Sequence, residues 1–538
     1  MVLLCAGAVL RVWQYLSNNS LWLDEAALAR NIVERSPREL LQPLAYAQVA
    51  PAGFLLIEKG AVWTLGNTEW ALRLFPLLCG LGALWIFWRV AVRILSGWTA
   101  VYATGLFALA TPLVYFSSQV KQYSSDAAAT TVLLAAAMWL RSASMGQRWH
   151  RAACVAALGA IVAWISQPAL FVLTGIGAAL LWSHWRAPQP RGLKSAIFVC
   201  GAWAVSASLS AALAVRNVSL ADRDYLDWYW SNGLMPWPPT SLADVLWIWN
   251  RLTWLFGAFV TGLRRTNGGL GYPWSQVFVV LTVVGFVALW RQKRDAALML
   301  LLPAVLTILA AALQLYPFSG RVVTFLVPAL LIATAAGVAY VIDHMPARLQ
   351  FSVPVLLAVA IGSPVYATIV ALPPERTEHL RPVIAAIAQQ RRADDGIYVY
   401  YGAGQSFLYY APHFGFTPDG YRIGRCGVTD FRKYLRDLDR FRGRSRVWLV
   451  STHAPVNAVE VRTMVGYLNA IGRRLQAYEE QATSGFASNA ATAYLFDLSD
   501  PSRLGQASAE TFAIPLVPVD PMYARWGCYG AQSTSGGL

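Results

Sequence analysis

EWALRLFPLLCGLGALWIFWRVAVRIL, residues 69–95, is the stretch that decides the fold class of this chain. Residues 70–92 within it are almost entirely apolar, and a helix needs roughly 20 such residues to cross a bilayer. The whole chain has the same character, since 57% of its 538 residues are hydrophobic, 13% are charged and the mean hydropathy is +0.44. Ordinary soluble domains carry about 25% charged residues. The composition therefore indicates an integral membrane protein.

Further apolar runs of suitable length accompany this one, so we expect about eleven membrane-spanning helices and a mainly α fold. The first run contains Arg11 and leads into a polar motif without a small-residue cleavage site, so we expect a span rather than a signal peptide. Its length is marginal for a bilayer, which leaves open a start further upstream. The expected spans are 1–16, 70–92, 98–116, 123–141, 151–165, 168–184, 195–215, 274–290, 296–315, 322–342 and 350–371.

The net charge of +15 comes from basic residues grouped between the apolar runs. A nucleic-acid-binding protein would gather them on one basic face, so we exclude that class of partner. The groups occupy alternate connections, which the positive-inside rule assigns to the cytoplasm. We therefore expect a multi-pass protein of the inner cell membrane. The groups are Arg89 and Arg93; Arg141, Arg148 and Arg151; Arg186, Arg191 and Lys194; Arg291, Lys293 and Arg294; and Arg348.

Two of the connections expected outside are long. The first, residues 17–69, contains LDEAALARNIVERS, PRELLQPLAYAQ and APAGFLLIEKGAVWTLG, in which apolar residues recur at helical spacing but charges are too frequent for a span. Helices that lie along the membrane surface have this pattern. The second, residues 216–273, includes DRDYLDWYWSNGLMPWPP, and we interpret it as a loop or re-entrant segment on the outer surface, anchored by Trp and Tyr.

After Leu372 the composition becomes polar, which predicts a membrane domain over 1–372 and an extracytoplasmic domain over 373–538. The second domain alternates stretches typical of short strands with stretches typical of amphipathic helices, a pattern that predicts a small α/β domain. An oxidising exterior is compatible either with a disulfide between Cys426 and Cys528 or with two free thiols. The expected strands are GIYVYYGA and RVWLVST, and the expected helices are TDFRKYLRDLDRFRG and NAVEVRTMVGYLNAIGRR.

Ionisable groups near membrane depth are costly, so those at the expected outer ends of the spans are candidates for function. Two of them are cations on the side that the charge rule leaves poor in cations, and an anionic ligand such as a phosphate would explain them. A nearby carboxylate can take a proton from an attacking hydroxyl or hold a divalent cation. The candidate catalytic residues are Asp24, Glu25 and Asp126, and the candidate substrate-binding residues are Lys121, Tyr123, Tyr316 and Arg321.

Each candidate also has a purely structural explanation. Asp24 and Glu25 open a helix, where acidic residues interact favourably with the helix dipole. Asp126 is placed to cap the fourth span. Lys121 can extend its ammonium to lipid headgroups, and Arg321 can bind a lipid phosphate.

Several stretches together resemble bacterial polyprenyl-phosphate-sugar glycosyltransferases of the GT-C fold, the family 39-like group that includes protein O-mannosyltransferases and lipid A aminoarabinose transferases. The resemblance covers most of the first 370 residues, and its order and spacing are more specific than any single motif. GIYVYYGAGQSFLYYA in the tail is also similar to members of this group. The stretches that carry it are LWLDEAALARNI, APAGFLL, residues 69–95, VKQYSSDAAATTVLLAAA and YPFSGRVVTFLVPALLIATAAG.

The resemblance implies transfer of a sugar from a polyprenyl-phosphate donor to an acceptor hydroxyl on the outer face, usually with inversion at the anomeric carbon. Asp24 matches the family's acidic residue in the first outer loop, the candidate general base, and Glu25 would support it. Asp126 matches a second acidic position, where it would orient the acceptor or a cation. Lys121 and Arg321 are assigned to the donor phosphate by the charge argument alone. The acceptor could be a protein, a lipid or a glycan.

One departure from the family concerns the donor. Aminoarabinose transferases carry a Lys-Pro step that contacts the donor phosphate, whereas this chain has Ala50 and Pro51 at that point. Another cation must then contact the phosphate, or the donor differs, so we do not transfer the aminoarabinose substrate to this chain.

Three questions stay open at the level of sequence. Two carboxylates could bind Mg²⁺ or Mn²⁺, but no spacing demands a metal, and His344 and His379 lack metal-ligand spacing. A transporter or lipid flippase would also be polytopic with buried charges, although it would place them near the midplane within repeated halves, and we find no internal repeat. A non-catalytic assembly or sensor protein is the third alternative.

Overall fold

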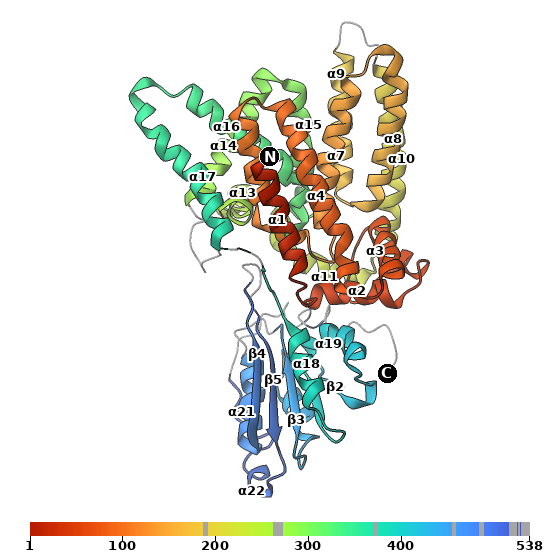
Figure 1. Ribbon diagram of the computed structural model, residues 1–538, viewed down its shortest axis with the longest axis vertical. Helices are drawn as coiled ribbons and strands as arrows, with labels where there is room; N and C mark the ends of the chain where they lie inside the picture. Colours follow the sequence, from red (N-terminus) through yellow and green to blue (C-terminus); the bar gives the residue numbers. More distant parts are fainter. Residues whose placement is uncertain are drawn as a thin grey trace. The chain divides into compact units, whose positions relative to one another are not determined.

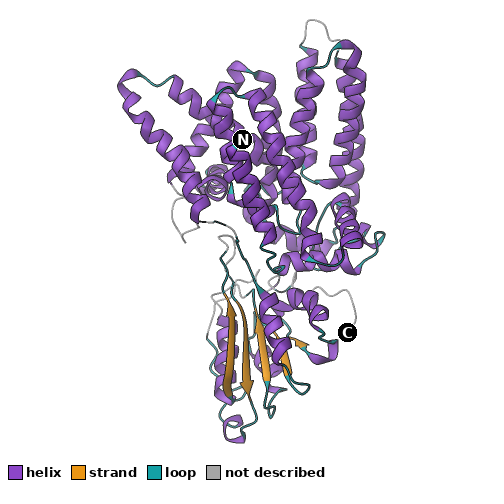
Figure 2. Ribbon diagram, in the orientation of Figure 1, coloured by secondary structure: helices purple, strands orange, loops and turns teal. Residues whose placement is uncertain are grey.

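The computed structural model describes residues 1–186, 192–261, 273–370, 372, 374–453, 459–483, 489–515, 525 and 528. They form two compact units (Figure 1). The helical unit comprises Met1–Ser17, Ala50–Ser219 and Tyr229–Pro373; the mixed unit comprises Asn18–Val49, Leu220–Trp228 and Pro374–Leu538. All strands of the described chain lie in the mixed unit (Figure 2). The predicted fold class, mainly helical with a C-terminal α/β part, is confirmed.

The apolar runs predicted as spans are helical in the described part of the chain. The helices they form are α1 (Val2–Leu16), α4 (Glu69–Ile94), α5 (Trp98–Leu109), α6 (Thr111–Phe116), α7 (Tyr123–Arg141), α8 (Arg148–Ile165), α9 (Ala169–Trp185), α10 (Leu193–Arg216), α14 (Pro273–Gln292), α15 (Arg294–Ala312), η5 (Gly320–Leu326), α16 (Val327–Asp343) and α17 (Val353–Val370).

Five helices of the described chain are long and apolar enough to cross a membrane on their own. These are Glu69–Ile94, Leu193–Arg216, Trp274–Gln292, Arg294–Ala312 and Gly320–Asp343. Shorter apolar helices, among them α1, α5 and α9, accompany them. The helix Glu69–Ile94 is formed by the long apolar stretch 69–95, and it begins where the Thr68 hydroxyl accepts a hydrogen bond from the backbone N–H of Ala71.

The expected continuous span 98–116 is in fact two helices, because the backbone leaves the helical region at Ala110, with φ −58° and ψ 105°. The break exposes the last carbonyl groups of α5, which need donors. Arg11 of α1 supplies them, since its guanidinium donates to the carbonyls of Ala108 at 3.0 Å and Phe107 at 3.2 Å. This interaction explains why a fully buried arginine occurs in the first apolar helix.

Small residues allow close helix packing in the helical unit. A Cβ atom on Gly285 of α14 would lie 1.7 Å from the carbonyl oxygen of Ala333 in α16, and one on Gly337 would lie 1.8 Å from that of Leu281. Only glycine fits where two helix backbones approach so closely. The α14 and α16 helices therefore form a tight pair on which the neighbouring helices pack.

Both of the long segments expected outside contain helices. Residues 17–69 form α2 (Leu23–Glu34), η1 (Glu39–Leu41) and α3 (Ala52–Leu65). The stretch interpreted as a loop or re-entrant segment is more helical than expected, since its described part contains α11 (Leu220–Tyr229), η3 (Ser231–Gly233), α12 (Leu242–Val245), α13 (Trp247–Phe256) and the π-helical turn η4 (Gly257–Thr261). Residues 262–272 of that stretch lie outside the described residues.

The mixed unit is built on a sheet with the strand order β2-β1-β3-β5-β4. β1 pairs in parallel with β2 and β3, and β5 pairs antiparallel with β3 and β4. Helix α18 (Leu380–Gln390) packs against β4 and β5, while α20 (Arg432–Asp439) and α21 (Val459–Ile471) share a core with Tyr398 and Leu449. The strands are β1 (Gly396–Val399), β2 (Arg422–Ile423), β3 (Val447–Ser451), β4 (Arg473–Glu480) and β5 (Ala491–Asp497).

The sequence predicted part of this unit. The two expected strands are β1 and β3, and the two expected helices contain α20 and α21. The expected helix over 457–474 ends earlier, at Ile471, because its last two residues begin β4, and its first two lie outside the described residues. β4 was not predicted from the sequence. Its residues are largely exposed on both faces, so the alternation of apolar and polar residues that indicates a half-buried strand is missing.

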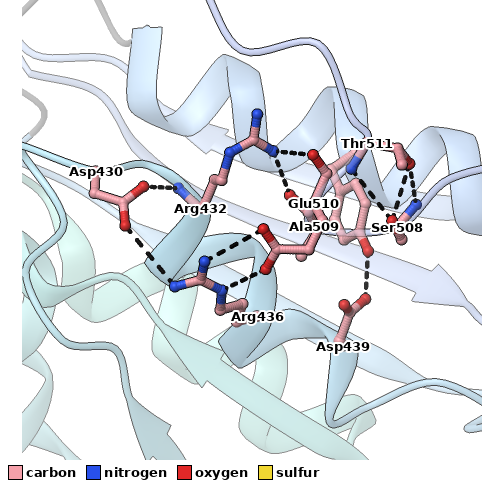
Figure 3. A network of polar contacts seen from close by, with 9 residues as sticks. Asp430, Arg432, Arg436, Asp439, Ser508, Ala509, Glu510 and Thr511 are labelled. Carbon is pink, nitrogen blue, oxygen red and sulfur yellow. Dashed lines mark hydrogen bonds and ion pairs between the residues drawn. The ribbon is translucent and has the colours of Figure 1, made fainter.

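Two sets of contacts connect the last described residues to α20 and to the segment that precedes it. Cys426 and Cys528 form a disulfide with a Cα–Cα distance of 5.8 Å, which decides between the alternatives left open by the sequence. Arg436 contacts both carboxylate oxygens of Glu510, at 2.7 and 3.3 Å, and Arg432 donates to the carbonyl of Ala509 at 2.8 Å (Figure 3). Cys528 is therefore held covalently and Glu510 by a bidentate ion pair.

Candidate active-site residues

A stacked arginine forms the centre of the candidate site in the helical unit. The Arg321 guanidinium lies over the ring of Tyr123, 5.6 Å from its centroid, and over that of Trp230 at 5.8 Å. Gly320, with a φ of +56°, makes the turn that starts η5, and a Cβ atom there would lie 3.5 Å from the Trp230 ring. Stacking uses the flat face of a guanidinium, while phosphate recognition uses its N–H edges, so the two are compatible.

Asp126 and Tyr316 belong to the same neighbourhood. Tyr316 lies within electrostatic range of both Asp126 and Tyr123, and its hydroxyl donates to the carbonyl of Val322 at 2.8 Å. Asp126 is 2% exposed, and its Oδ1 atom has no hydrogen-bond partner among the described residues. Helix α7 begins after Gln122, and no side chain caps it, so the capping explanation for Asp126 does not hold.

Lys121 is buried, with 5% of its surface exposed. A lysine that extended to lipid headgroups would keep its ammonium in the interfacial region, so the structural explanation for this residue is weakened. The structure thus brings four predicted residues together in the helical unit, namely Tyr123, Asp126, Tyr316 and Arg321, and buries Lys121 two residues before Tyr123.

A second buried carboxyl group, Glu58 of α3, was missed by the sequence analysis. Glu58 is fully buried, and neither of its carboxyl oxygens has a hydrogen-bond partner among the described residues. Burial raises the pKa of Glu58 well above its ordinary value. Glu58 and Asp126 both lie within electrostatic range of Cys79. The sequence feature that could have indicated Glu58 is the Glu-Lys pair inside the apolar stretch FLLIEKGAV.

The acidic motif belongs to the mixed unit, where Asp24 and Glu25 occupy the first turn of α2. Gln48 donates from Nε2 to Oδ1 of Asp24 at 3.2 Å. Glu25 is 1% exposed. Their position in the first turn agrees with the helix-dipole explanation. A residue at a helix N-terminus can also act in catalysis, so the catalytic role of Asp24 stays a prediction.

Residues of the C-terminal part hold the start of α2. Oε2 of Glu378 accepts a hydrogen bond from the backbone N–H of Leu23 at 3.2 Å, and the Tyr410 hydroxyl oxygen accepts one from the backbone N–H of Leu21 at 2.7 Å. Nδ1 of His379 accepts from the N–H of Ser20 at 3.2 Å. His379, to which the sequence analysis assigned nothing, therefore anchors the acidic motif.

His453 is the titratable group next to Asp24 that sequence analysis did not find. Its Nδ1 lies 2.6 Å from Oε1 of Glu378, whose side chain is 1% exposed. Burial lowers the pKa of His453, but the charge and hydrogen bond of Glu378 and the charge of Asp24 outweigh burial, so this pKa is raised. Its φ of +51° is rare for a residue with a side chain, which indicates that its contacts fix the backbone.

Among the described residues, no group of three or more His, Cys, Asp and Glu side chains converges so that it could hold a metal ion. The divalent cation considered from the sequence therefore stays a prediction. His344 stacks on Tyr340, with ring centroids 4.0 Å apart.

The structure is similar to solved structures of ArnT and of an archaeal oligosaccharyltransferase. ArnT from Cupriavidus metallidurans bound to undecaprenyl phosphate shares 14% identity over 94% of this chain and 99% of its own, with a TM-score of 0.49. The Archaeoglobus fulgidus oligosaccharyltransferase tethered with an acceptor peptide shares 10% identity over 88% of this chain and 72% of its own, with a TM-score of 0.48.

The same archaeal oligosaccharyltransferase in complex with Zn and sulfate shares 12% identity over 83% of this chain and 67% of its own, with a TM-score of 0.45. No protein-family model matches the chain, and no curated protein matches it. Similarity at these levels does not by itself determine an activity, so the function must rest on the residues.

Proposed function

We propose that this protein is a membrane glycosyltransferase that transfers a sugar from a polyprenyl-phosphate donor to an acceptor hydroxyl on the extracytoplasmic face. The observation that carries the proposal is Arg321 stacked on Tyr123 and Trp230, with Asp126 and Tyr316 in the same buried neighbourhood. Arg321 is a cation at the expected outer end of the membrane helices, where the positive-inside rule predicts few cations. An anionic ligand explains its presence there. Aromatic stacking pre-organises its guanidinium for a phosphate.

The chemistry assigned to the residues follows from their types. Asp24 takes the proton of the acceptor hydroxyl, the hydroxyl oxygen bonds to the anomeric carbon, and the bond from that carbon to the phosphate oxygen breaks. Polyprenyl phosphate leaves with the bonding electrons, and inversion results because attack and departure occur on opposite faces. Glu25 supports the base, and Asp126 orients the acceptor or a cation.

Arg321 and Lys121 are the proposed contacts of the donor phosphate, with Tyr123 and Tyr316 beside them. Stabilising the negative charge that develops on the leaving phosphate is the main electrostatic contribution that such a site can make. Because Ala50 replaces the lysine of the aminoarabinose transferases, the donor sugar is left unassigned. The proposed donor class agrees with the undecaprenyl phosphate bound in the ArnT structure.

The proposal is tested with the purified full-length protein in lipid nanodiscs and a panel of radiolabelled polyprenyl-phosphate sugars. We expect release of polyprenyl phosphate that depends on an acceptor and that is lost in Arg321→Gln. The matched control is Arg348→Gln, which removes the same charge from an exposed residue. Transbilayer movement of the labelled lipid without release of polyprenyl phosphate would support a flippase and refute the transferase.

A further inference from the structure

A cavity of about 420 Å³ lies within the helical unit where the end of α7 meets the start of α15. Its lining includes Met138 and Arg141 from α7, and Lys293, Arg294 and Met299 around the start of α15. Nothing in the proposed transfer reaction uses it. We propose that this cavity binds an anionic phosphate group, and that the phosphate is the headgroup of a membrane lipid.

The charges of the lining favour an anion. The lining contains three basic side chains, those of Arg141, Lys293 and Arg294, and one carboxylate, that of Asp295. Asp295 forms an ion pair with Nη2 of Arg141. The other terminal nitrogen of Arg141, Nη1, is buried and has no hydrogen-bond partner among the described residues. A buried guanidinium N–H without an acceptor is costly, and a phosphate oxygen would satisfy it.

Lys293 and Arg294 make different contacts at the cavity. Nζ of Lys293 donates to the carbonyl of Ile94 at 2.7 Å and so caps the end of α4. The Arg294 side chain is exposed, with its guanidinium 5.9 Å from the centroid of the Trp290 ring. Arg294 and Arg141 are therefore the two side chains expected to contact the ligand, one from α15 and one from α7.

The first turn of α15 adds backbone donors. The first bond of that helix runs from the N–H of Ala297 to the carbonyl of Lys293, at 3.0 Å, so the N–H groups of the three preceding residues make no intrahelical bond. All three of those residues, Arg294, Asp295 and Ala296, line the cavity. Helix N-termini favour anions, which strengthens the argument from the side chains.

Membrane topology alone does not explain this arrangement. The positive-inside rule requires basic residues in cytoplasmic connections, but it does not require two of them to face one cavity with an unsatisfied guanidinium nitrogen. Arg148 and Arg141 both lie within electrostatic range of His184, so a second guanidinium is present in the region of the site. Basic cavities between membrane helices on the cytoplasmic side are typical binding sites of anionic lipid headgroups.

The cavity is separate from the proposed donor site. Arg141 lies 15 positions after Asp126 in α7, which corresponds to about 22 Å along a helix. The side chains of Met138 and Met299 give the cavity apolar walls, and flexible thioether side chains suit an acyl chain better than a free ion. These walls favour a lipid over soluble phosphate as the source of the anion.

The test measures binding of dioctanoyl phosphatidylglycerol and, separately, of inorganic phosphate to the purified full-length protein in neutral detergent. We expect saturable binding of the phosphatidylglycerol, weakened at least about fivefold in Arg294→Gln. The matched control is Arg291→Gln, which removes the same charge from α14, where Nη1 of Arg291 contacts the Tyr340 hydroxyl outside the cavity. Its affinity should change by less than about twofold.

Comparing the affinities of the two ligands distinguishes a lipid headgroup from soluble phosphate as the natural ligand. Tighter binding of phosphatidylglycerol than of inorganic phosphate assigns the cavity to a lipid, and the reverse order assigns it to soluble phosphate. Equal loss of binding in Arg291→Gln and Arg294→Gln, or no saturable binding of either ligand, would overturn the proposal. Because Arg294 is exposed, its substitution should leave the elution profile in size-exclusion chromatography unchanged.

Discussion

Glu378 links His453 to the acidic motif, since one of its carboxylate oxygens lies 2.6 Å from Nδ1 of His453 and the other accepts the backbone N–H of Leu23 at 3.2 Å. Leu23 directly precedes Asp24 in the chain. A single buried carboxylate therefore connects the C-terminal part of the mixed unit to the residue proposed as general base. The charge of His453 also acts on Asp24 through space, so both the position and the electrostatic surroundings of Asp24 depend on this pair.

Asp24→Asn should lower the rate of sugar transfer by about 10²- to 10⁴-fold, because an amide cannot accept the proton of the attacking hydroxyl. Expression, membrane insertion and the thermal unfolding midpoint should be retained. Acceptor-dependent release of polyprenyl phosphate is the measurement. The control is Glu34→Gln at the other end of α2, where the carboxylate pairs with Arg30 and is 53% exposed. An Asp24→Asn protein with full activity would exclude Asp24 as the base.

His453→Gln should destabilise the protein mainly in acid. The pKa of His453 is raised in the folded protein, so the charged imidazole interacts more favourably there than in the unfolded chain. Its contribution is complete below the unfolded pKa of about 6.5 and is lost as pH rises through the folded pKa. We expect a loss of about 1 kcal/mol at pH 5.5 that shrinks at pH 9.

The measurement is the difference in thermal or denaturant unfolding between wild type and variant at several pH values. His413→Gln is a matched control in the same unit, because Nδ1 of His413 contacts a backbone carbonyl, that of Tyr409 at 3.0 Å, where Nδ1 of His453 contacts a carboxylate. A His453→Gln difference that grew with rising pH would contradict the assignment of a charged His453.

Arg321→Lys should raise the KM for the lipid donor by about 10- to 100-fold, although it keeps the charge. An ammonium lacks the planar face that a guanidinium can present to aromatic rings, and it cannot give two parallel hydrogen bonds to a phosphate. Steady-state kinetics with varied donor concentration measures the effect. The same change at Arg348, which is exposed, serves as the control. An unchanged KM would remove Arg321 from donor binding.

Cys426→Ser should lower the free energy of unfolding by about 2–4 kcal/mol, because the disulfide closes a long loop with a sequence separation of 102 residues. Limited proteolysis should cut the segment after Thr511 faster than in the wild type, whereas the ion pair of Arg436 and Glu510 should keep the preceding residues protected. Cys154→Ser, which changes an exposed free thiol, is the control. Equal protease resistance with and without the disulfide would contradict this role.

The candidate site was only partly accessible to sequence reasoning. Tyr123, Asp126, Tyr316 and Arg321 could be proposed because their polar groups interrupt apolar runs, and the structure places them in one neighbourhood. Trp230 was interpreted as a membrane anchor, since nothing in its local sequence indicates stacking on an arginine. Glu58 was visible as a charge in an apolar stretch, but its burial depends on the packing of α3.

The sequence by itself determined the helical segments of the membrane part, because transfer of a helix into a bilayer depends on the composition of about 20 consecutive residues. It also indicated β1 and β3, whose buried residues form short apolar runs. Only the tertiary structure decided that Glu378 and His453 join Asp24, and that Arg141 and Arg294 face one cavity. Those residues are far apart in the chain, and contacts of that kind arise from packing, which leaves no periodic pattern in the local sequence.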